Sequence, residues 1–381
     1  MKYKIDFINS SYRRYYKQNR TKILNAIDRC YKYGEFVLRK DVELFENNLA
    51  KFVGSKYALG VNSGTDALKI AYKALGIKPG DEVITVSHVF IAPIQEIVHH
   101  GAVPILIDVK EDGLMDETLI EQSITQKTVG IVPIHLSGKV CNMTEIMRIA
   151  KKYNLWVVED ACQALGASWD GKKAGTIGDI GCFSFIAPKT LGVGGDAGGI
   201  VTNNKELFTK MNLLRNHWNI TQGVLHGHQL KQPDVMGWGY NSRLDNIHAA
   251  VLNIKLKLYP KMLKRRKDIG MRYNAGLQAL SDLNLLELPI QQKDQIYQEF
   301  IIKISCMDKF KKFMDKEGIE LLIRDVIPNH KLKGLNLEHF NLPITESLAV
   351  SSVRLPTYPE LTDDEVNKII VAIWKFFGKK I

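Results

Sequence analysis

The chain has 381 residues, of which 45% are hydrophobic, so it is long enough to bury a large core and to form two domains. Its formal net charge is +11, and its five cysteines show neither CxxC pairs nor tight spacing, which argues against a zinc site and a disulfide framework. No apolar stretch resembles a signal peptide or approaches the length of a membrane span, so we expect a cytoplasmic protein with no membrane partner.

The positive charge is concentrated near the N-terminus. Residues 1–40 hold 11 Lys or Arg against 3 Asp or Glu, and a second basic run covers Lys255–Lys267. Such clusters can bind nucleic acid, but most runs of surface charge are simply solvated. We therefore expect no nucleic-acid partner, and we expect the basic surface to attract an anionic substrate such as a nucleotide diphosphate.

Strands and helices alternate from about residue 56 to residue 204. The predicted strands cover residues 83–87, 103–107, 130–134, 155–158, 182–185 and 199–202. Helical patterns lie between them at 92–100 and 143–153. This alternation predicts an α/β fold with a mostly parallel sheet that is covered by helices on both faces.

The pattern changes after Asn241. It becomes helical and basic through Lys267, and alternating stretches such as EFIIKIS and IELLIRDVI follow. We therefore predict a large domain over residues 1–250, which includes an N-terminal helical segment, and a small α+β domain over residues 251–381.

The segment LGVNSGTDALKIAYKALG predicts a phosphate-binding helix. Its apolar residues recur on one helical stripe, which places Ser63, Gly64 and Thr65 at the N-terminus of the helix. Free backbone N–H groups at such a terminus can bind a phosphate.

An acid follows the buried strand at residues 155–158. Glu159, Asp160 and Gln163 come directly after its apolar run, so an acidic side chain emerges at the carboxyl end of the strand. A site for pyridoxal 5'-phosphate (PLP) needs such an acid, because it keeps the ring nitrogen protonated and makes the ring an electron sink.

Lys189 lies in GDIGCFSFIAPKTLGVGGDAGG, where a strand-like segment leads into a glycine-rich loop. A lysine that forms a Schiff base needs unhindered backbone around it, since its neutral amine must reach a carbonyl. A single lysine in such a loop is usually a surface residue. Together with Asp160 and the SGT turn, however, Lys189 predicts a PLP site.

Two other patterns do not predict a site. The GxGxxA match at residues 192–197 is followed by GGIVTNN, which indicates a strand where a dinucleotide-binding fold requires a helix. The pairs His99/His100 and His226/His228 lack acid or cysteine partners at ligand spacing, so we predict no metal.

The chain closely resembles the DegT/DnrJ family of PLP-dependent nucleotide-sugar aminotransferases, of fold type I in the aspartate aminotransferase superfamily. Four motifs carry the resemblance in order: SGTDAL, EDACQALGA, GDIGCFSF with the lysine five residues after Ser184, and GYNSRLDNIHAAVL. The match runs from about Gly34 to Pro359. It implies PLP as cofactor, a mostly parallel seven-stranded type of sheet with helices on both faces, and a smaller α+β C-terminal domain.

The resemblance assigns the catalytic roles to two residues. Lys189 would form the Schiff base and would move the proton between the substrate carbon and the cofactor. Asp160 would pair with the pyridinium nitrogen.

It also assigns cofactor contacts. Gly64, Thr65 and Ser184 would hold the phosphate, and Gln163 would approach the phenolic side of the ring. Phe90 would stack on the ring, although it could also be an ordinary core residue.

Asn241 matches a family asparagine that reaches the phosphate of the neighbouring subunit. The resemblance therefore implies a homodimer with shared active sites.

Departures from the family pattern concern the substrate. Ser137 and Lys139 in HLSGK stand where the family commonly has tyrosine and glutamine, and Pro188 stands where serine or threonine is common. These changes remove no group that transamination needs, but they leave the sugar and nucleotide open. His330, in IPNHKL, corresponds to a family histidine close to the site, so Ser137 and His330 are the candidate substrate residues.

The resemblance implies amino transfer from L-glutamate to the 3- or 4-keto group of a dTDP-, UDP- or GDP-linked 6-deoxyhexose. The aminosugar would serve a surface polysaccharide such as lipopolysaccharide, another glycan or an antibiotic. Two alternatives remain open. A PLP-dependent sugar dehydratase of the same fold would be expected to carry histidine at position 189, and a non-catalytic regulatory or binding protein would be expected to have lost Lys189, Asp160 or the SGT turn.

Overall fold

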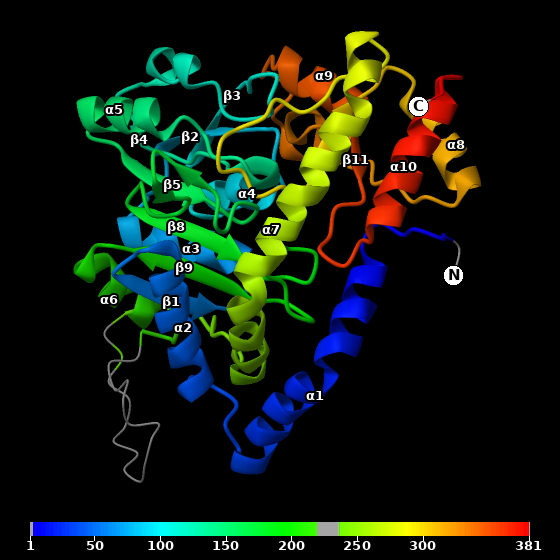
Figure 1. Cartoon of the computed structure of the whole chain (residues 1–381). Helices are drawn as coiled ribbons and strands as arrows, with labels where there is room; N and C mark the ends of the chain where they lie inside the picture. The colour runs from blue at the N-terminus through cyan, green and yellow to red at the C-terminus, as the bar shows by residue number, and fades with distance from the viewer. Residues whose placement is uncertain (1–2, 219–234, 236, 381) are drawn as a thin grey trace.

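The computed structural model describes residues 3–218, 235 and 237–380. Its centre is a seven-stranded sheet (Figure 1). In spatial order the strands are β1 (Tyr57–Val61), β9 (Gly198–Thr202), β8 (Ile180–Ser184), β5 (Trp156–Asp160), β4 (Thr128–Ile131), β2 (Glu82–Val86) and β3 (Val103–Ile107). β9 pairs antiparallel with β1 and β8, and every other neighbouring pair is parallel. The mostly parallel sheet is therefore confirmed.

The strands and helices predicted between residues 83 and 202 fall where the structure has them. Strand 103–107 and helix 143–153 agree with β3 and with α5 (Met143–Tyr153) at both ends, and the ends of the others differ by at most three residues. We did not predict β1 as a strand. Gly60, the fourth of its five residues, weakens the strand pattern. The structure requires glycine there, because a Cβ would lie only 2.8 Å from the Leu244 side chain.

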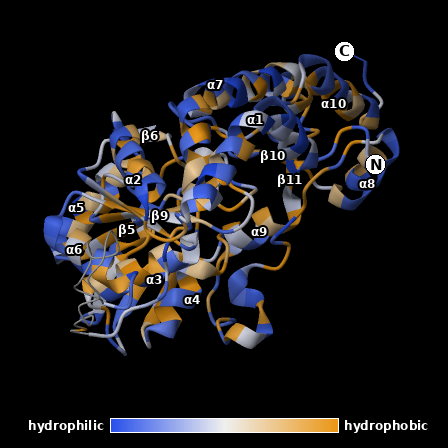
Figure 2. Ribbon diagram, turned by 90° about the horizontal axis from the view of Figure 1, so that it is seen from below, coloured by the Kyte–Doolittle hydropathy of each residue, from blue (hydrophilic) through white to orange (hydrophobic). Residues whose placement is uncertain are grey.

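Helices cover the sheet on both faces. α3 (Gly64–Leu75) packs on β8 and β9, with α4 (Ala92–His99) and α6 (Lys205–Leu214) beside it. α2 (Lys40–Val53) packs against β1 and against the long helix α7 (Asn246–Asp282). Figure 2 shows the hydrophobic strands β5 and β9 enclosed by helices with hydrophilic outer faces. This separation buries the apolar strands of a sheet that is covered on both sides.

The C-terminal part has a second hydrophobic core. It is built on the antiparallel pair β10 (Phe300–Lys303) and β11 (Ser352–Leu355) with α8 (Met307–Glu317) and α10 (Asp363–Phe376). EFIIKIS contains β10, as predicted. IELLIRDVI is not a regular strand, since Ile319 and Leu322 form only isolated bridges, and the partner of β10 is β11, which we did not predict.

Helices α1 (Asn9–Tyr33) and α7 connect the two cores. α7 contributes residues to both hydrophobic cores, and the predicted domain boundary at residue 250 lies inside this helix. α1 packs against α7, and Arg14 of α1 forms an ion pair of 2.6 Å with Glu365 of α10.

The remaining elements are short. They are β6 (Ser168–Trp169), β7 (Lys172–Lys173), α9 (Pro343–Ser351) and the 3₁₀ turns Glu117–Leu119, Glu121–Ser123, Leu136–Gly138, Asn329–Lys331 and Lys333–Leu335. No helix in the described part of the chain is long and apolar enough to cross a membrane.

Candidate active site

A pocket of about 290 Å³ lies where the carboxyl ends of several strands meet. The parallel relationships place the carboxyl ends of β2, β4, β5 and β8 at one edge of the sheet, and β1 ends at the same edge because it is antiparallel to β9. Crevices at this edge are where open α/β sheets bind ligands. Seven predicted site residues line the pocket: Gly64, Thr65, Phe90, Asp160, Gln163, Ser184 and Lys189.

Lys189 enters the pocket from the loop after β8. Its backbone N–H donates to the carbonyl oxygen of Ile186 at 2.9 Å, which forms a tight turn. Gly192 allows this turn to close, because a Cβ there would lie 2.3 Å from the carbonyl oxygen of Ala187. The Lys189 amine makes no hydrogen bond or ion pair with any described residue, so it is free to react with a bound carbonyl.

Asp160 is the acid that reaches the pocket. It is the last residue of β5 and only 6% exposed, and its Oδ1 accepts a 3.0 Å hydrogen bond from the backbone N–H of Cys162. A buried carboxylate that accepts so few hydrogen bonds can still pair with a positively charged group of a ligand. It could bind a protonated ring nitrogen.

Glu159, the preceding residue, is fully buried and is saturated by donors. Its Oε1 accepts hydrogen bonds from the backbone N–H groups of Ile177 and Gly178. Its Oε2 accepts one from the N–H of Gly175 and lies 2.8 Å from Nε2 of His135. Successive strand residues point to opposite faces, so only one acid of the EDA motif is available to a ligand.

The N-terminus of α3 forms an anion-binding corner. Ser63 caps the helix by accepting a 3.1 Å hydrogen bond from the N–H of Asp66, and the N–H groups of Gly64 and Thr65 have no partner among the described residues. Ser184 lies against this corner, because a Cβ on Gly64 would come within 2.7 Å of the Ser184 Cβ. Two free N–H groups and a hydroxyl at a helix N-terminus fit a phosphate.

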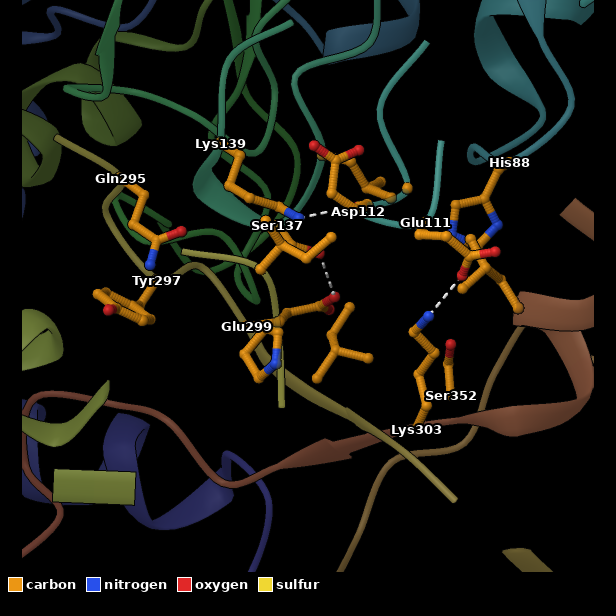
Figure 3. Close-up of a pocket in the computed structure, with 16 residues that line it drawn as sticks. His88, Glu111, Asp112, Ser137, Lys139, Gln295, Tyr297, Glu299, Lys303 and Ser352 are labelled. Atoms are coloured by element: carbon orange, nitrogen blue, oxygen red, sulfur yellow. Dashed lines mark hydrogen bonds and ion pairs between the residues drawn. The ribbon is translucent and has the colours of Figure 1, made fainter. Parts of the chain in front are cut away.

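Gln163 and Ser137 are coupled, although Ser137 lines an adjoining pocket (Figure 3). The Ser137 N–H donates to Oε1 of Gln163 at 3.0 Å, and its hydroxyl donates to Glu299 at 3.3 Å. Ser137 adopts a left-handed backbone conformation with φ of 56°. Lys139 of the same segment is buried and donates to the backbone carbonyl of Asp112, and burial lowers the pKa of its amine.

Phe90 is exposed at the edge of the pocket. It is 67% exposed at the wall of the pocket, which excludes the alternative that it is an ordinary core residue in this chain. A ring held there has an open face for stacking.

Asn241 and His330 do not line the pocket. Asn241 is exposed. His330 is fully buried, with Nδ1 2.8 Å from the Ser87 hydroxyl and Nε2 3.1 Å from Glu346. His330 thus contacts the segment that leads to Phe90 instead of contacting the pocket.

Sequence reasoning missed several charged or titratable residues of the pocket wall, and three of them are basic or imidazole side chains of special interest. His88, Arg324 and Arg354 all line it. Burial and, to a smaller extent, the positive charges of Arg354 and Arg324 lower the pKa of His88 to about 4. The sequence did hold a signal for Arg354, which is the only charged residue in the strand SVRL. Charged residues are rarely fully buried unless they are paired.

No group of three or more His, Cys, Asp or Glu within the described residues is arranged to hold a metal, and His226 and His228 lie outside those residues.

Comparison with known proteins agrees with this pocket. The model of the DegT/DnrJ/EryC1/StrS aminotransferase family matches residues 17–374. The chain belongs to this family. It is accordingly a PLP-dependent aminotransferase of fold type I.

Relatives at moderate identity cover nearly the whole chain. The dTDP-3-amino-3,4,6-trideoxy-alpha-D-glucose transaminase of Micromonospora megalomicea is 35% identical, over 95% of this chain and 96% of its own length. The UDP-N-acetyl-3-dehydro-alpha-D-glucosamine 3-aminotransferase of Acidithiobacillus ferrooxidans is 36% identical, over 93% of each. The crystal structure of S. venezuelae DesV in complex with a ketimine intermediate has a TM-score of 0.90 and 32% identity, and covers 97% of both chains.

Proposed function

We propose that this aminotransferase moves an amino group from L-glutamate to the keto group of a nucleotide-linked 6-deoxyhexose. The free Lys189 amine is the observation that carries the proposal, because it lies in one pocket with Asp160 and the anion-binding corner of α3. The names of the Micromonospora and Acidithiobacillus relatives support a nucleotide-sugar substrate, and both names concern carbon 3 of the sugar. A dTDP- or UDP-linked 3-keto sugar is therefore the first substrate to test.

Each residue around the pocket has a distinct role in this proposal. When bound, PLP supplies a carbonyl for Schiff-base formation and a ring that accepts an electron pair. Gly64 and Thr65 bind its phosphate through their backbone N–H groups, and the Ser184 hydroxyl adds a third donor. Asp160 holds the ring nitrogen in its protonated form.

Lys189 performs the proton transfer. Its amine would remove the proton from the α-carbon of glutamate and would later deliver a proton to the sugar carbon. Phe90 would cover one face of the bound ring, and Gln163 would lie on its phenolic side. Gln163 is fixed for this task because its side-chain carbonyl already binds the Ser137 N–H.

We further propose a homodimer in which Asn241 completes the active site of the neighbouring subunit. Its exposure fits this proposal, and Trp238 nearby in the sequence is 92% exposed. Large apolar side chains at the surface often mark protein–protein contacts.

The dimer can be tested by complementation. Lys189→Ala and Asn241→Ala are expected to be inactive as separate proteins, whereas subunits that exchange between them should regain activity in one of two sites. Failure of the mixture to regain activity, with exchange confirmed by differently tagged subunits, would contradict the shared site.

In this proposal the protein acts in the cytoplasm, and its product is an aminosugar for a surface polysaccharide such as lipopolysaccharide, another glycan or an antibiotic. The basic N-terminal region would favour the approach of the anionic nucleotide sugar.

The decisive experiment follows the absorption spectrum of the purified protein with PLP, before and after L-glutamate is added. The visible band of the lysine-bound cofactor should convert to the pyridoxamine form, and a keto-sugar substrate should restore it. Lys189→Ala should lack the first band, while Lys205→Ala, an exposed lysine of α6, should behave like the wild type. Conversion by glutamate without recovery by any nucleotide-linked keto-sugar would refute the sugar assignment and leave the transaminase activity standing.

A further inference from the structure

A second cavity lies behind the loop that carries Lys189. Its volume is about 500 Å³, within the range of about 300–1,000 Å³ that is typical of ligand pockets. Its walls come from α1, α7, the loop after β8 and the residues Pro359 and Glu360, so we call it the α1–α7 cavity. Lys189 lines both this cavity and the pocket that contains Asp160. The proposed transamination gives the α1–α7 cavity no role.

Buried polar groups without partners belong to this wall. Arg266 is only 4% exposed, and its Nη1 donates to three backbone carbonyl groups, but its Nε has no hydrogen-bond partner among the described residues. The hydroxyl of Tyr15, a residue that is 7% exposed, is also buried without a partner in the described part of the chain. Because buried polar groups are normally paired, these two leave hydrogen-bonding capacity for a ligand.

Lys255 adds a second positive charge. Its amine donates to the backbone carbonyl of Gly192 and lies 4.6 Å from the centroid of the Tyr15 ring. Burial lowers the pKa of this amine to about 8, and the nearby charge of Glu360 opposes the shift. Glu360 is the one acid among the described residues of the wall, and its Oε2 already accepts a 2.7 Å hydrogen bond from a serine hydroxyl of α1. Together with Arg266, Lys255 therefore gives the wall an excess of positive charge.

Three tyrosines of α1 complete the wall. Tyr12, Tyr15 and Tyr16 lie on one face of the helix because of their i, i+3, i+4 spacing, and all three line the cavity. Tyr12 is partly buried and Tyr16 is 43% exposed, so ring surface remains open to a ligand. Aromatic side chains bind nucleobases by stacking, whichever base is present. Aromatic rings next to basic side chains thus favour a ligand that is both planar and anionic.

We propose that the α1–α7 cavity binds a nucleotide. The base stacks on the tyrosines of α1, and the phosphate groups accept charge-assisted hydrogen bonds from Lys255 and Arg266. The nucleotide is either the nucleotide end of the keto-sugar substrate or a separate, free nucleotide. The first of these sources rests on the proposed function, whereas the site itself can be tested by binding alone.

The first test is calorimetric titration of the PLP-loaded enzyme with dTDP. Tyr12→Ala and Lys255→Met should each raise the Kd about 10- to 100-fold, because the first variant loses a stacking ring and the second loses a charged donor. Tyr33→Ala, at a 65% exposed position of α1, and Lys257→Met, at an exposed position of α7, are the matched controls and should bind dTDP like the wild type. Unchanged dTDP affinity in either Tyr12→Ala or Lys255→Met would overturn the proposal.

Inorganic pyrophosphate separates the two kinds of contact. Lys255→Met should weaken pyrophosphate binding, whereas Tyr12→Ala should leave it unchanged, because pyrophosphate has no base to stack. Wild-type enzyme that bound pyrophosphate as tightly as dTDP would show that the cavity is only an inorganic anion site, and the nucleotide assignment would be wrong.

A crystal structure of the wild-type holoenzyme with dTDP does not depend on the folding of a variant. We expect the base beside Tyr12 and the phosphates beside Lys255. A nucleotide bound only outside the cavity, or a cavity filled by a segment of a second copy of the chain, would refute the proposal.

Kinetics then identify the source of the nucleotide. If it belongs to the substrate, dTDP should compete with the nucleotide-linked keto-sugar, and Lys255→Met should raise the KM for that sugar without changing the half-reaction with L-glutamate. If it is a separate nucleotide, dTDP and the keto-sugar should bind together. Binding of dTDP in the cavity of an enzyme that aminates no nucleotide-linked keto-sugar would refute the proposed function and leave the nucleotide site intact.

Discussion

Glu159 and Asp160 are consecutive residues of β5 whose carboxylates lie in opposite environments. Glu159 is enclosed by backbone N–H groups and His135, while Asp160 faces the pocket with one hydrogen bond from Cys162. The strand alternation separates a structural acid from an acid that is available to a ligand. Replacing each carboxylate by an amide should therefore have different effects, on activity at Asp160 and on stability at Glu159.

Asp160→Asn should reduce the rate of the glutamate half-reaction by about 100-fold or more, the size expected when a positioned charge at a reacting centre is lost. Glu159→Gln should instead lower the free energy of unfolding by about 1–3 kcal/mol, because it leaves one of several buried donors unsatisfied. Single-turnover kinetics and urea unfolding of both variants separate the effects. If Asp160→Asn proved as active as the wild type, Asp160 would not be the partner of the ring nitrogen.

Gly64→Ala should weaken PLP binding and lower stability by about 1–3 kcal/mol, the usual cost of overpacking. A Cβ at this position would lie 2.7 Å from the Ser184 Cβ and 3.1 Å from Sγ of Cys162, so the phosphate corner must shift. Cofactor titration and thermal unfolding measure the two effects. Gly334→Ala, where no atom lies within 4 Å of the added Cβ, is the control and should change neither quantity.

The sequence was sufficient to locate one side of the pocket. Asp160 and Lys189 follow strands, and the SGT turn precedes a helix, so local pattern and the parallel order of the strands place them at one edge. The position of each of these residues is determined by the strand that it follows or by the helix that it begins.

The opposite wall could not be predicted in the same way. Arg354 reaches the pocket from the C-terminal core, through the pairing of β10 with β11, and β11 was not recognised as a strand. His330 shows the converse problem. The resemblance placed it close to the site, and it does bond to Ser87 beside the pocket residue His88, but its ring is held by the Ser87 hydroxyl and Glu346 and does not line the pocket. Such placements depend on tertiary contacts that periodicity does not encode.

The Arg14–Glu365 pair should make stability depend on pH in the acid range. The hydrogen bond from Arg14 lowers the pKa of Glu365 to about 2, from an ordinary value of 4.5. A carboxyl whose folded pKa is depressed stabilises the protein above its unfolded pKa, and this contribution is lost as the pH falls from about 4.5 to 2. Because the Arg14 side chain is 36% exposed, solvent screening limits the contribution to about 1 kcal/mol.

Glu365→Gln tests this pair, since glutamine can keep the capping box with Thr362 and loses only the charge. The difference in unfolding free energy between this variant and the wild type should be present at pH 6 and should shrink on acidification below about pH 4. Glu338→Gln, at an exposed position, should show no such difference. If the difference in unfolding free energy between Glu365→Gln and the wild type stayed constant down to about pH 2, the ion pair would not be its cause.

Phe90→Ala should weaken PLP binding about 2- to 10-fold while leaving the stability of the PLP-free protein nearly unchanged. The reason is that the ring is 67% exposed, so its removal forms no cavity, whereas stacking of aromatic rings contributes about 0.5–1.5 kcal/mol. Phe90→Tyr keeps a ring and should bind PLP like the wild type. Val371→Ala truncates another exposed apolar side chain, on α10, and should have no effect on binding. Fluorescence titration with PLP gives the affinities, and urea unfolding of the PLP-free proteins gives the stabilities. A large loss of stability in Phe90→Ala without a change in PLP affinity would mean that this ring supports the fold of its loop and does not contact the cofactor.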